Sequence, residues 1–363
     1  MNRVLIVRLG ALGDIVHGIP VAAALRRGYP DARIDWLVSA KHRAVLDLVP
    51  VVDRRLALGP GGALFDAVRE LRRANYDVAL DLQGLLKSSI LARASGAKRV
   101  IGFGSRSARE PLARLFYTEA HDPVGRAAPS GAAGAGSSGP SRGLYGPAGR
   151  SLHVIYQNLS LLEPLGVMAR EPEFPIEAVD SAVARRIVEE TGGRYALLNP
   201  GAGWPNKQWP PERFGAVAAA LRERRGLTSV VLWGPGEDAL AAEVAAHSGG
   251  AARVSPATTI ADLVALARAA SLMISGDTGP AHLAAAVGTP IVGLYGPTWP
   301  ARNGPWSPDD VVLSRAEICR CHHRRRCRLP VRCLLDVQVA ETLAAVERRL
   351  AAVERGAPAG RSQ

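Results

Sequence analysis

Long apolar runs are absent from this chain of 363 residues. No stretch reaches the roughly 18 uninterrupted apolar residues that a membrane span needs. The apolar segment at the N-terminus is short and runs into Arg8, unlike a signal peptide. Cysteine is scarce, and all 4 cysteines lie between Cys319 and Cys333, which does not resemble a disulfide framework. We therefore expect a cytoplasmic protein, either soluble or peripheral to a membrane.

Two common motifs are also missing. The apolar segment Val4–Val7 reads as a strand, and the turn after it holds only Gly10 and Gly13. It therefore lacks the G-x-G-x-x-G fingerprint of dinucleotide-binding folds, which argues against NAD. A DxD-type pair of carboxylates that would hold a metal ion is not evident either. We expect no cofactor and no essential metal.

Basic residues outnumber acidic ones, 45 against 33, which gives a net charge of +12. Such an excess favours anionic partners, namely nucleic acid, a negatively charged membrane face or a phosphorylated substrate. The alternative is heavy arginine usage in a chain rich in alanine and arginine. Charge alone does not decide between these possibilities.

Apolar strands alternate with helices in both halves of the sequence. Short buried strands are predicted at Val4–Val7, Ile34–Val38, Tyr76–Asp81, Arg99–Phe103, Tyr195–Leu198, Ser229–Leu232, Leu272–Ile274 and Ile291–Tyr295. Helices are predicted at Ile19–Arg27, Ser151–Gly166, Pro211–Arg225, Glu237–Ala246, Thr259–Arg268, Ala281–Val287 and Gln338–Val353. This alternation predicts an α/β fold of two doubly wound, Rossmann-like parallel sheets that face a central cleft.

Composition divides the chain into regions. We expect an N-terminal domain at residues 1–175, a C-terminal domain at 176–353 and a disordered tail at 354–363. Residues 125–150 are almost entirely Gly, Ala, Ser, Pro and Arg, so we expect a flexible insertion there.

The segment Ser271–Thr298 carries the clearest chemistry. Its first strand ends in Gly276-Asp277-Thr278-Gly279-Pro280, and a helix follows with His282 in its first turn. Free backbone N–H groups and the partial positive charge at a helix start bind anions, so a diphosphate is a natural ligand. The alternative is an ordinary helix start that Asp277 or Thr278 caps.

Polar groups follow three other predicted strands. The loop Asn199–Pro210 holds Lys207, which can neutralise a phosphate, and the turn after Leu232 holds Glu237, which can accept ribose hydroxyls. Because parallel strands end at one edge of a sheet, these residues should converge. Asp14 follows the first strand of the other half and could act as a general base, although it could also cap a helix or turn.

Together these segments resemble the bacterial lipopolysaccharide heptosyltransferases, glycosyltransferases of family 9 with GT-B architecture. The resemblance rests on Val4–Pro20, Tyr76–Ser88, Ala108–Tyr117, Asn199–Trp209, Trp233–Glu237 and Ser275–Pro297. Gln83–Ser88 and Arg109–Leu112 are most similar to the heptosyltransferase I group, which adds heptose to the Kdo of the inner core.

The resemblance implies an inverting transferase that moves heptose from ADP-L-glycero-D-manno-heptose to Kdo-lipid A, with Asp14 as the base. It implies that the donor contacts the following residues of the C-terminal domain: Gly201, Ala202, Lys207, Glu237, Asp277, Thr278, Gly279 and His282. The implied acceptor contacts are Gly13, Lys87 and Arg109. Relatives carry hydroxyl side chains where this chain has Ala202 and Gly203, so backbone N–H groups would serve there.

The expected location is the inner face of the cytoplasmic membrane, where the basic surface would favour anionic lipids. No nucleic acid partner is expected. One alternative is a related GT-B transferase with another nucleotide-sugar or core acceptor. A second is a non-catalytic basic protein that binds nucleic acid or a membrane.

The segment Glu317–Asp336 combines four cysteines, two histidines and six arginines. Zinc is one possibility, but the C-x-C pair followed by wider gaps is not the usual pair of C-x-x-C knuckles. Buried or unpaired thiols are the other possibility, and the resemblance does not decide between them.

Overall fold

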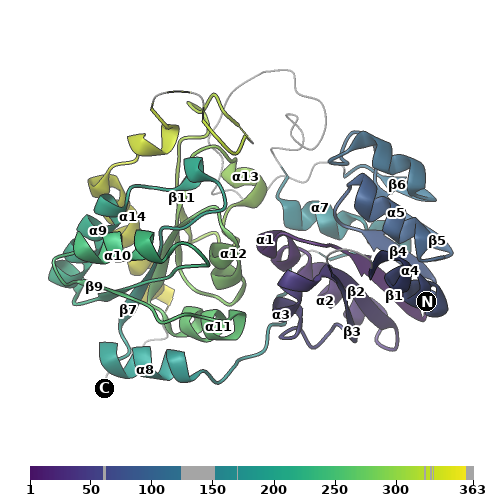
Figure 1. Cartoon of the computed structure of the whole chain (residues 1–363), viewed down its shortest axis with the longest axis horizontal. Helices are drawn as coiled ribbons and strands as arrows, with labels where there is room; N and C mark the ends of the chain where they lie inside the picture. The colour runs from purple at the N-terminus through teal and green to yellow at the C-terminus, as the bar shows by residue number, and fades with distance from the viewer. Residues whose placement is uncertain are drawn as a thin grey trace. The chain divides into compact units, whose positions relative to one another are not determined.

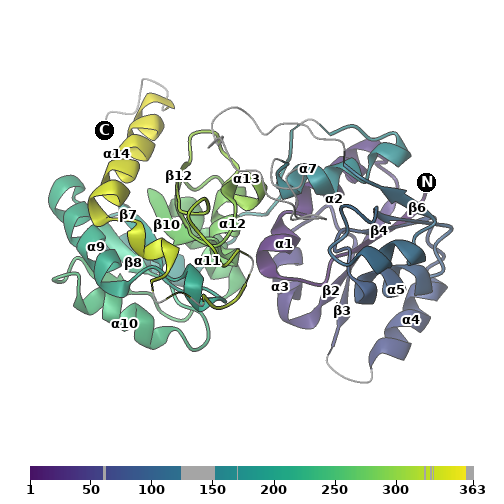
Figure 2. The same cartoon turned by 90° about the horizontal axis from the view of Figure 1, so that it is seen from above.

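The computed structural model describes residues 1–59, 63–123, 152–169, 171–322, 324–327, 329 and 331–356. The chain divides into two compact units, with the boundary along the sequence between Glu177 and Ala178, and each unit is described by itself (Figures 1 and 2). The predicted insertion at 125–150 lies outside the described residues. Across the described ranges, none of the helices has the length and apolar character that crossing a membrane requires.

The N-terminal unit is built on a six-stranded sheet in which every neighbouring pair is parallel. Its order is β3-β2-β1-β4-β5-β6, so the order reverses between β1 and β4. The strands are β1 (Arg3–Val7), β2 (Arg33–Ser39), β3 (Arg54–Leu58), β4 (Val78–Asp81), β5 (Arg99–Phe103) and β6 (Glu119–His121).

The helices of this unit follow the strands along the chain. They are α1 (Leu12–Val16), α2 (Ile19–Gly28), η1 (Ala40–His42), α3 (Arg43–Leu46), α4 (Ala63–Arg73), α5 (Leu86–Ala94), η2 (Pro111–Phe116), α7 (Val154–Ser160) and η3 (Glu163–Leu165). The helix predicted at Ser151–Gly166 is wrong at both ends, because α7 begins at Val154 after the N-cap His153 and, after Ser160, the chain turns into the separate 3₁₀ helix η3, which begins at Glu163.

The C-terminal unit repeats the same plan, with strand order β12-β11-β10-β7-β8-β9 and parallel pairs throughout. The strands are β7 (Tyr195–Asn199), β8 (Thr228–Val231), β9 (Ala252–Val254), β10 (Leu272–Gly276), β11 (Ile291–Tyr295) and β12 (Val311–Ser314). All residues of β7, β10 and β11 are buried, so helices and loops cover both faces of the sheet. The α/β prediction is confirmed.

Helix starts and ends in this unit follow local chemistry. The helices are α8 (Ala182–Thr191), η4 (Pro205–Lys207), α9 (Pro211–Arg225), α10 (Asp238–Ala246), α11 (Ile260–Ala269), α12 (Gly279–Ala286), α13 (Pro300–Asn303), η5 (Cys333–Asp336) and α14 (Val339–Gly356). A capping box starts α11, since Asp262 N donates to Thr259 Oγ1 at 3.1 Å and Thr259 N to Asp262 Oδ2 at 2.9 Å.

The disordered tail predicted from residue 354 is wrong at its first three residues, because α14 continues to Gly356. Glu354 pairs with Arg225 of α9 at 3.3 Å, which favours the longer helix. Residues 357–363 lie outside the described residues.

A buried ion pair fastens α14 to the sheet. Arg349 Nε donates to Asp310 Oδ1 at 2.8 Å, and the same oxygen accepts Ile291 N of β11 at 2.8 Å. Both side chains are almost fully buried. Burial raises the pKa of Asp310, and its hydrogen bonds to Ile291 and Arg349 oppose that shift.

Replacing Arg349 with Met should lower the free energy of unfolding by about 3 kcal/mol, because the Asp310 carboxylate then stays buried without its cation. Urea unfolding would measure the loss. The exposed neighbour in Arg348→Met is the matched control and should change little. Equal stability of the two variants would contradict a structural role for this ion pair.

Candidate functional site

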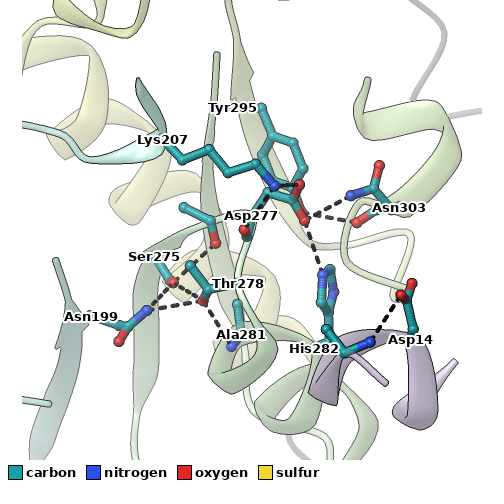
Figure 3. A network of polar contacts seen from close by, with 12 residues as sticks. Asp14, Asn199, Lys207, Ser275, Asp277, Thr278, Ala281, His282, Tyr295 and Asn303 are labelled. Atoms are coloured by element: carbon teal, nitrogen blue, oxygen red, sulfur yellow. Dashed lines mark hydrogen bonds and ion pairs between the residues drawn. The ribbon is translucent and has the colours of Figure 1, made fainter. Parts of the chain in front are cut away.

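Asp277, which directly follows β10, lies at the centre of a polar network (Figure 3). Its Oδ2 contacts Lys207 Nζ at 2.5 Å, while its Oδ1 contacts His282 Nε2 at 3.0 Å and accepts Asn303 Nδ2 at 2.7 Å. Lys207 also lies over the ring of Trp204, with Nζ 4.4 Å from the ring centroid. Three separate elements, η4, α12 and α13, thus direct donors at one carboxylate.

Electrostatics keep this carboxylate charged. Burial by itself would raise the pKa of Asp277, but the Lys207 charge and the His282 hydrogen bond hold it well below the usual 3.8. The lysine side chain is itself mostly buried. The network therefore presents a fixed cation at the edge of the sheet.

The helix start beside Asp277 is capped by Thr278, one of the two caps considered from sequence. Thr278 Oγ1 accepts Ala281 N at 3.4 Å, and Asn199 Nδ2 donates at 2.9 Å to Thr278 Oγ1 and to Ser275 Oγ. Gly279 opens the helix, so its N–H belongs to the unpaired first turn. This arrangement suits an anion.

Gly201 and Glu237 meet across two loops. A Cβ at Gly201 would overlap the Glu237 carboxylate, so only glycine permits this approach. Glu237 Oε2 also accepts Gly234 N at 3.0 Å, and the Ala202 carbonyl accepts Gln208 Nε2 at 3.4 Å. Each of these hydrogen bonds lies within one loop, and the approach of Glu237 to Gly201 places the turn after β8 beside the loop after β7.

These loops share one edge of the C-terminal sheet. The loop that carries Lys207 follows β7, and Asp277 follows its parallel neighbour β10, at the point where the strand order reverses. Ligands of open α/β sheets bind at such a reversal. The structure thus brings together in direct contact Lys207, Asp277 and His282, with Thr278 beside them.

Asp14 lies at the equivalent reversal of the N-terminal sheet, after β1. It belongs to the short helix α1, with Gly13 buried before it. Arg8 Nη2 lies 2.7 Å from Asp14 Oδ2, and Ala11 N donates to that oxygen at 3.2 Å. The buried Arg8 also donates to the carbonyl of Leu82. The carboxylate is thus oriented by groups on its own unit.

His42 is a further residue near Asp14 that sequence reasoning missed. Burial lowers the pKa of His42, as does Lys41, while the nearby Asp14 charge opposes this shift. A Cβ at Gly10 would lie 2.8 Å from the His42 ring, so glycine allows the close contact. The sequence offers no signal for His42, which lies in η1.

The segments that carry Lys87 and Arg109 are joined through Glu110. Glu110 Oε2 accepts Leu86 N at 2.6 Å, and Glu110 N donates to the Gly84 carbonyl at 2.9 Å. Both basic side chains are exposed. The structure therefore brings the two predicted acceptor segments together without fixing either basic side chain.

A buried carboxylate organises the same turn. Asp81 Oδ1 accepts Gln83 N at 2.8 Å, and its Oδ2 accepts Ser88 Oγ at 2.9 Å and Tyr117 Oη at 2.7 Å. Burial raises the pKa of Asp81 above its usual value. This network shapes the turn before α5.

Comparison with known proteins identifies the family. A model described as glycosyltransferase family 9 (heptosyltransferase) matches residues 64–128 and 145–331. The chain belongs to this family. The resemblance found in the sequence motifs is therefore confirmed, and the protein is a glycosyltransferase.

The relatives of this family 9 glycosyltransferase match most of its length. Lipopolysaccharide heptosyltransferase 1 of Pseudomonas aeruginosa is 30% identical over 340 residues, which cover 90% of this chain and 87% of that protein. Lipopolysaccharide heptosyltransferase 1 of Escherichia coli K12 is 26% identical over 329 residues, with coverage of 85% and 92%.

Solved structures share the fold. Escherichia coli heptosyltransferase WaaC with ADP has a TM-score of 0.73 at 22% identity, covering 96% of this chain and 99% of that one. A family 9 glycosyltransferase from Veillonella parvula has a TM-score of 0.76 at 22% identity, with coverage of 97% and 98%. The fold of this family 9 glycosyltransferase is therefore of the GT-B type.

The cysteine segment of this family 9 glycosyltransferase lies against its Lys207 loop. Asn206 Nδ2 donates to the Arg324 carbonyl at 2.8 Å and lies 3.6 Å from Cys321 Sγ, and Arg332 Nη1 donates to the Pro205 carbonyl at 2.6 Å. Cys319 and Cys321 are buried with their sulfur atoms 3.5 Å apart. Among the described residues, no group of three or more His, Cys, Asp or Glu side chains is placed to hold a metal ion.

Replacing Asp277 with Asn should destabilise this family 9 glycosyltransferase by about 3 kcal/mol at pH 7, since Lys207 loses its buried counter-charge. The pKa of Asp277 is lower in the folded protein than its usual 3.8, so wild type has this stability above pH 3.8 and loses it as the pH falls further. Urea unfolding at pH 7, 4 and about 3 should therefore show a difference in the free energy of unfolding between wild type and Asp277→Asn that becomes smaller only below pH 3.8. The control is Asp309→Asn, which changes an exposed aspartate. If the difference between wild type and Asp277→Asn stayed the same at all three pH values, the ionised Asp277 would not be its source.

Proposed function

We propose that this glycosyltransferase moves heptose from ADP-L-glycero-D-manno-heptose to the Kdo-lipid A inner core. The observation that carries the proposal is the Lys207–Asp277–His282 network beside the start of α12, which offers a fixed cation and the Gly279 N–H to a diphosphate. The names of the relatives, lipopolysaccharide heptosyltransferase 1, supply the sugar and the pathway.

The donor occupies the carboxyl edge of the C-terminal sheet in this proposal. Lys207 and the Gly279 N–H stabilise the charge that develops on the departing ADP. Because a diphosphate is already a good leaving group, no second carboxylic acid is required. Gly201, Ala202 and Glu237 border the same donor site, with backbone N–H groups of the loop available to the phosphates.

Asp14 is the general base of the proposed reaction. Its carboxylate takes the proton of an acceptor hydroxyl while the hydroxyl oxygen attacks the anomeric carbon. The bond from that carbon to the ADP oxygen breaks on the opposite side, which inverts the configuration. Arg8, at 2.7 Å, fixes the direction of the carboxylate.

The acceptor binds the N-terminal unit in this proposal. Lys87 and Arg109 are exposed and can reach the carboxylates and phosphates of Kdo-lipid A, while the backbone at Gly13 lies beside the base. Such an acceptor implies work at the cytoplasmic face of the inner membrane, where anionic lipids attract a chain with net charge +12.

The test is transfer from ADP-heptose to Kdo₂-lipid A by wild type, Asp14→Asn and Lys207→Met. Asp14→Asn should lower kcat by about 10²–10⁴-fold, because the proton acceptor is lost, and should leave ADP affinity unchanged. Lys207→Met should weaken ADP binding, which calorimetry would measure, as well as kcat.

Full activity of Asp14→Asn would refute its role as base. Wild type that binds ADP but transfers no heptose would exclude this sugar or acceptor and point to a related transferase with another nucleotide-sugar. An exposed aspartate away from the residues named above, as in Asp31→Asn, serves as the control and should keep normal turnover.

A further inference from the structure

Two leucines project together from the 3₁₀ helix η2. Leu112 is 60% exposed and Leu115 is 75% exposed. Side chains three residues apart eclipse one another in a 3₁₀ helix, so the two leucines share one side. Ala113 is fully buried and anchors the opposite side. A lone exposed leucine is ordinary, but a paired set on one short element forms an apolar patch.

The neighbouring helix α5 extends this patch. It packs against η2, and its Ile90 is 47% exposed. Lys87 and Arg93, three residues before and after Ile90, are also exposed and share its side of the helix. The α5–η2 surface, defined by Lys87, Ile90, Arg93, Leu112, Arg114 and Leu115, is therefore both apolar and basic.

The two elements that form the α5–η2 surface contain no acidic residue. Neither Leu86–Ala94 nor Pro111–Phe116 contains Asp or Glu. Glu110, between them in space, uses its carboxylate to accept Leu86 N. Exposed Arg106 and Arg109 precede η2 and add positive charge. Arg106 pairs with Asp122 at 3.4 Å, so Arg109 and the basic residues of α5 and η2 give the surface around the three large apolar side chains a net positive charge.

We infer that the α5–η2 surface docks onto an anionic lipid bilayer. The leucines and Ile90 enter the headgroup boundary, while the lysine and arginines pair with lipid phosphates. Nucleic acid offers nothing that buries such leucines, whereas a bilayer satisfies both features. This inference rests on the proposed function, because a lipid-linked acceptor has to be reached at a membrane.

Co-sedimentation with vesicles tests the inference directly. Wild type should bind vesicles of phosphatidylglycerol and phosphatidylcholine and should bind pure phosphatidylcholine far more weakly. The double variant L112S/L115S should lose about tenfold or more of its partition onto the anionic vesicles. Met168→Ser, which removes a side chain that is 63% exposed elsewhere on the same unit, should bind as wild type does.

Turnover separates this inference from the proposed function. L112S/L115S should keep wild-type activity on an acceptor without lipid chains and lose activity on acceptor embedded in anionic vesicles. Unchanged vesicle binding by the double variant would overturn the inference, even with heptose transfer intact. Absence of heptose transfer by wild type, with vesicle binding still dependent on the leucines, would overturn only the proposed function.

Discussion

The ionised carboxylate of Asp277 is the constraint on which the donor half depends. A buried carboxylate is costly unless hydrogen bonds and a cation surround it. Here Lys207, His282 and Asn303 approach from three elements that are separate along the chain. Movement of Lys207 leaves the Asp277 charge uncompensated, and movement of His282 or Asn303 removes a hydrogen bond from it, so the network fixes the relative positions of the 201–207 loop, α12 and α13.

The N-terminal unit also has a buried carboxylate at the corresponding strand end, but the groups around it differ. Asp81 ends β4, the strand beside the order reversal, yet its partners are hydroxyl and backbone N–H groups rather than a cation. Burial consequently raises the pKa of Asp81, whereas Lys207 and His282 lower that of Asp277. The same residue type at equivalent strand ends shapes a turn in one sheet and holds a charge in the other.

Regular elements with strong local signals were predictable from sequence. The bounds of β5, α9 and β11 are confirmed to the residue, because apolar runs end at glycine, proline or charged residues there. The short helix α1 was missed because its five residues are hidden in a glycine turn. The edge strand β12 was also missed, since its half-buried pattern lacks a continuous apolar run.

At the sites, Arg8, His42 and Asn303 escaped prediction because their contacts form only in the fold. The roles assigned to Asp14 and the donor residues remain predictions.

The position of the cysteine segment has a practical consequence for labelling. All 4 cysteines lie between Cys319 and Cys333, and this segment is tied through Asn206 and Arg332 to the loop that carries Lys207. Cys319 and Cys321 are buried, whereas Cys327 and Cys333 are only partly so. A thiol-reactive fluorophore thus attaches beside the Lys207 loop and leaves the N-terminal unit, which has no cysteine, unmodified. The native chain can therefore report spectroscopically on that loop without an engineered attachment point.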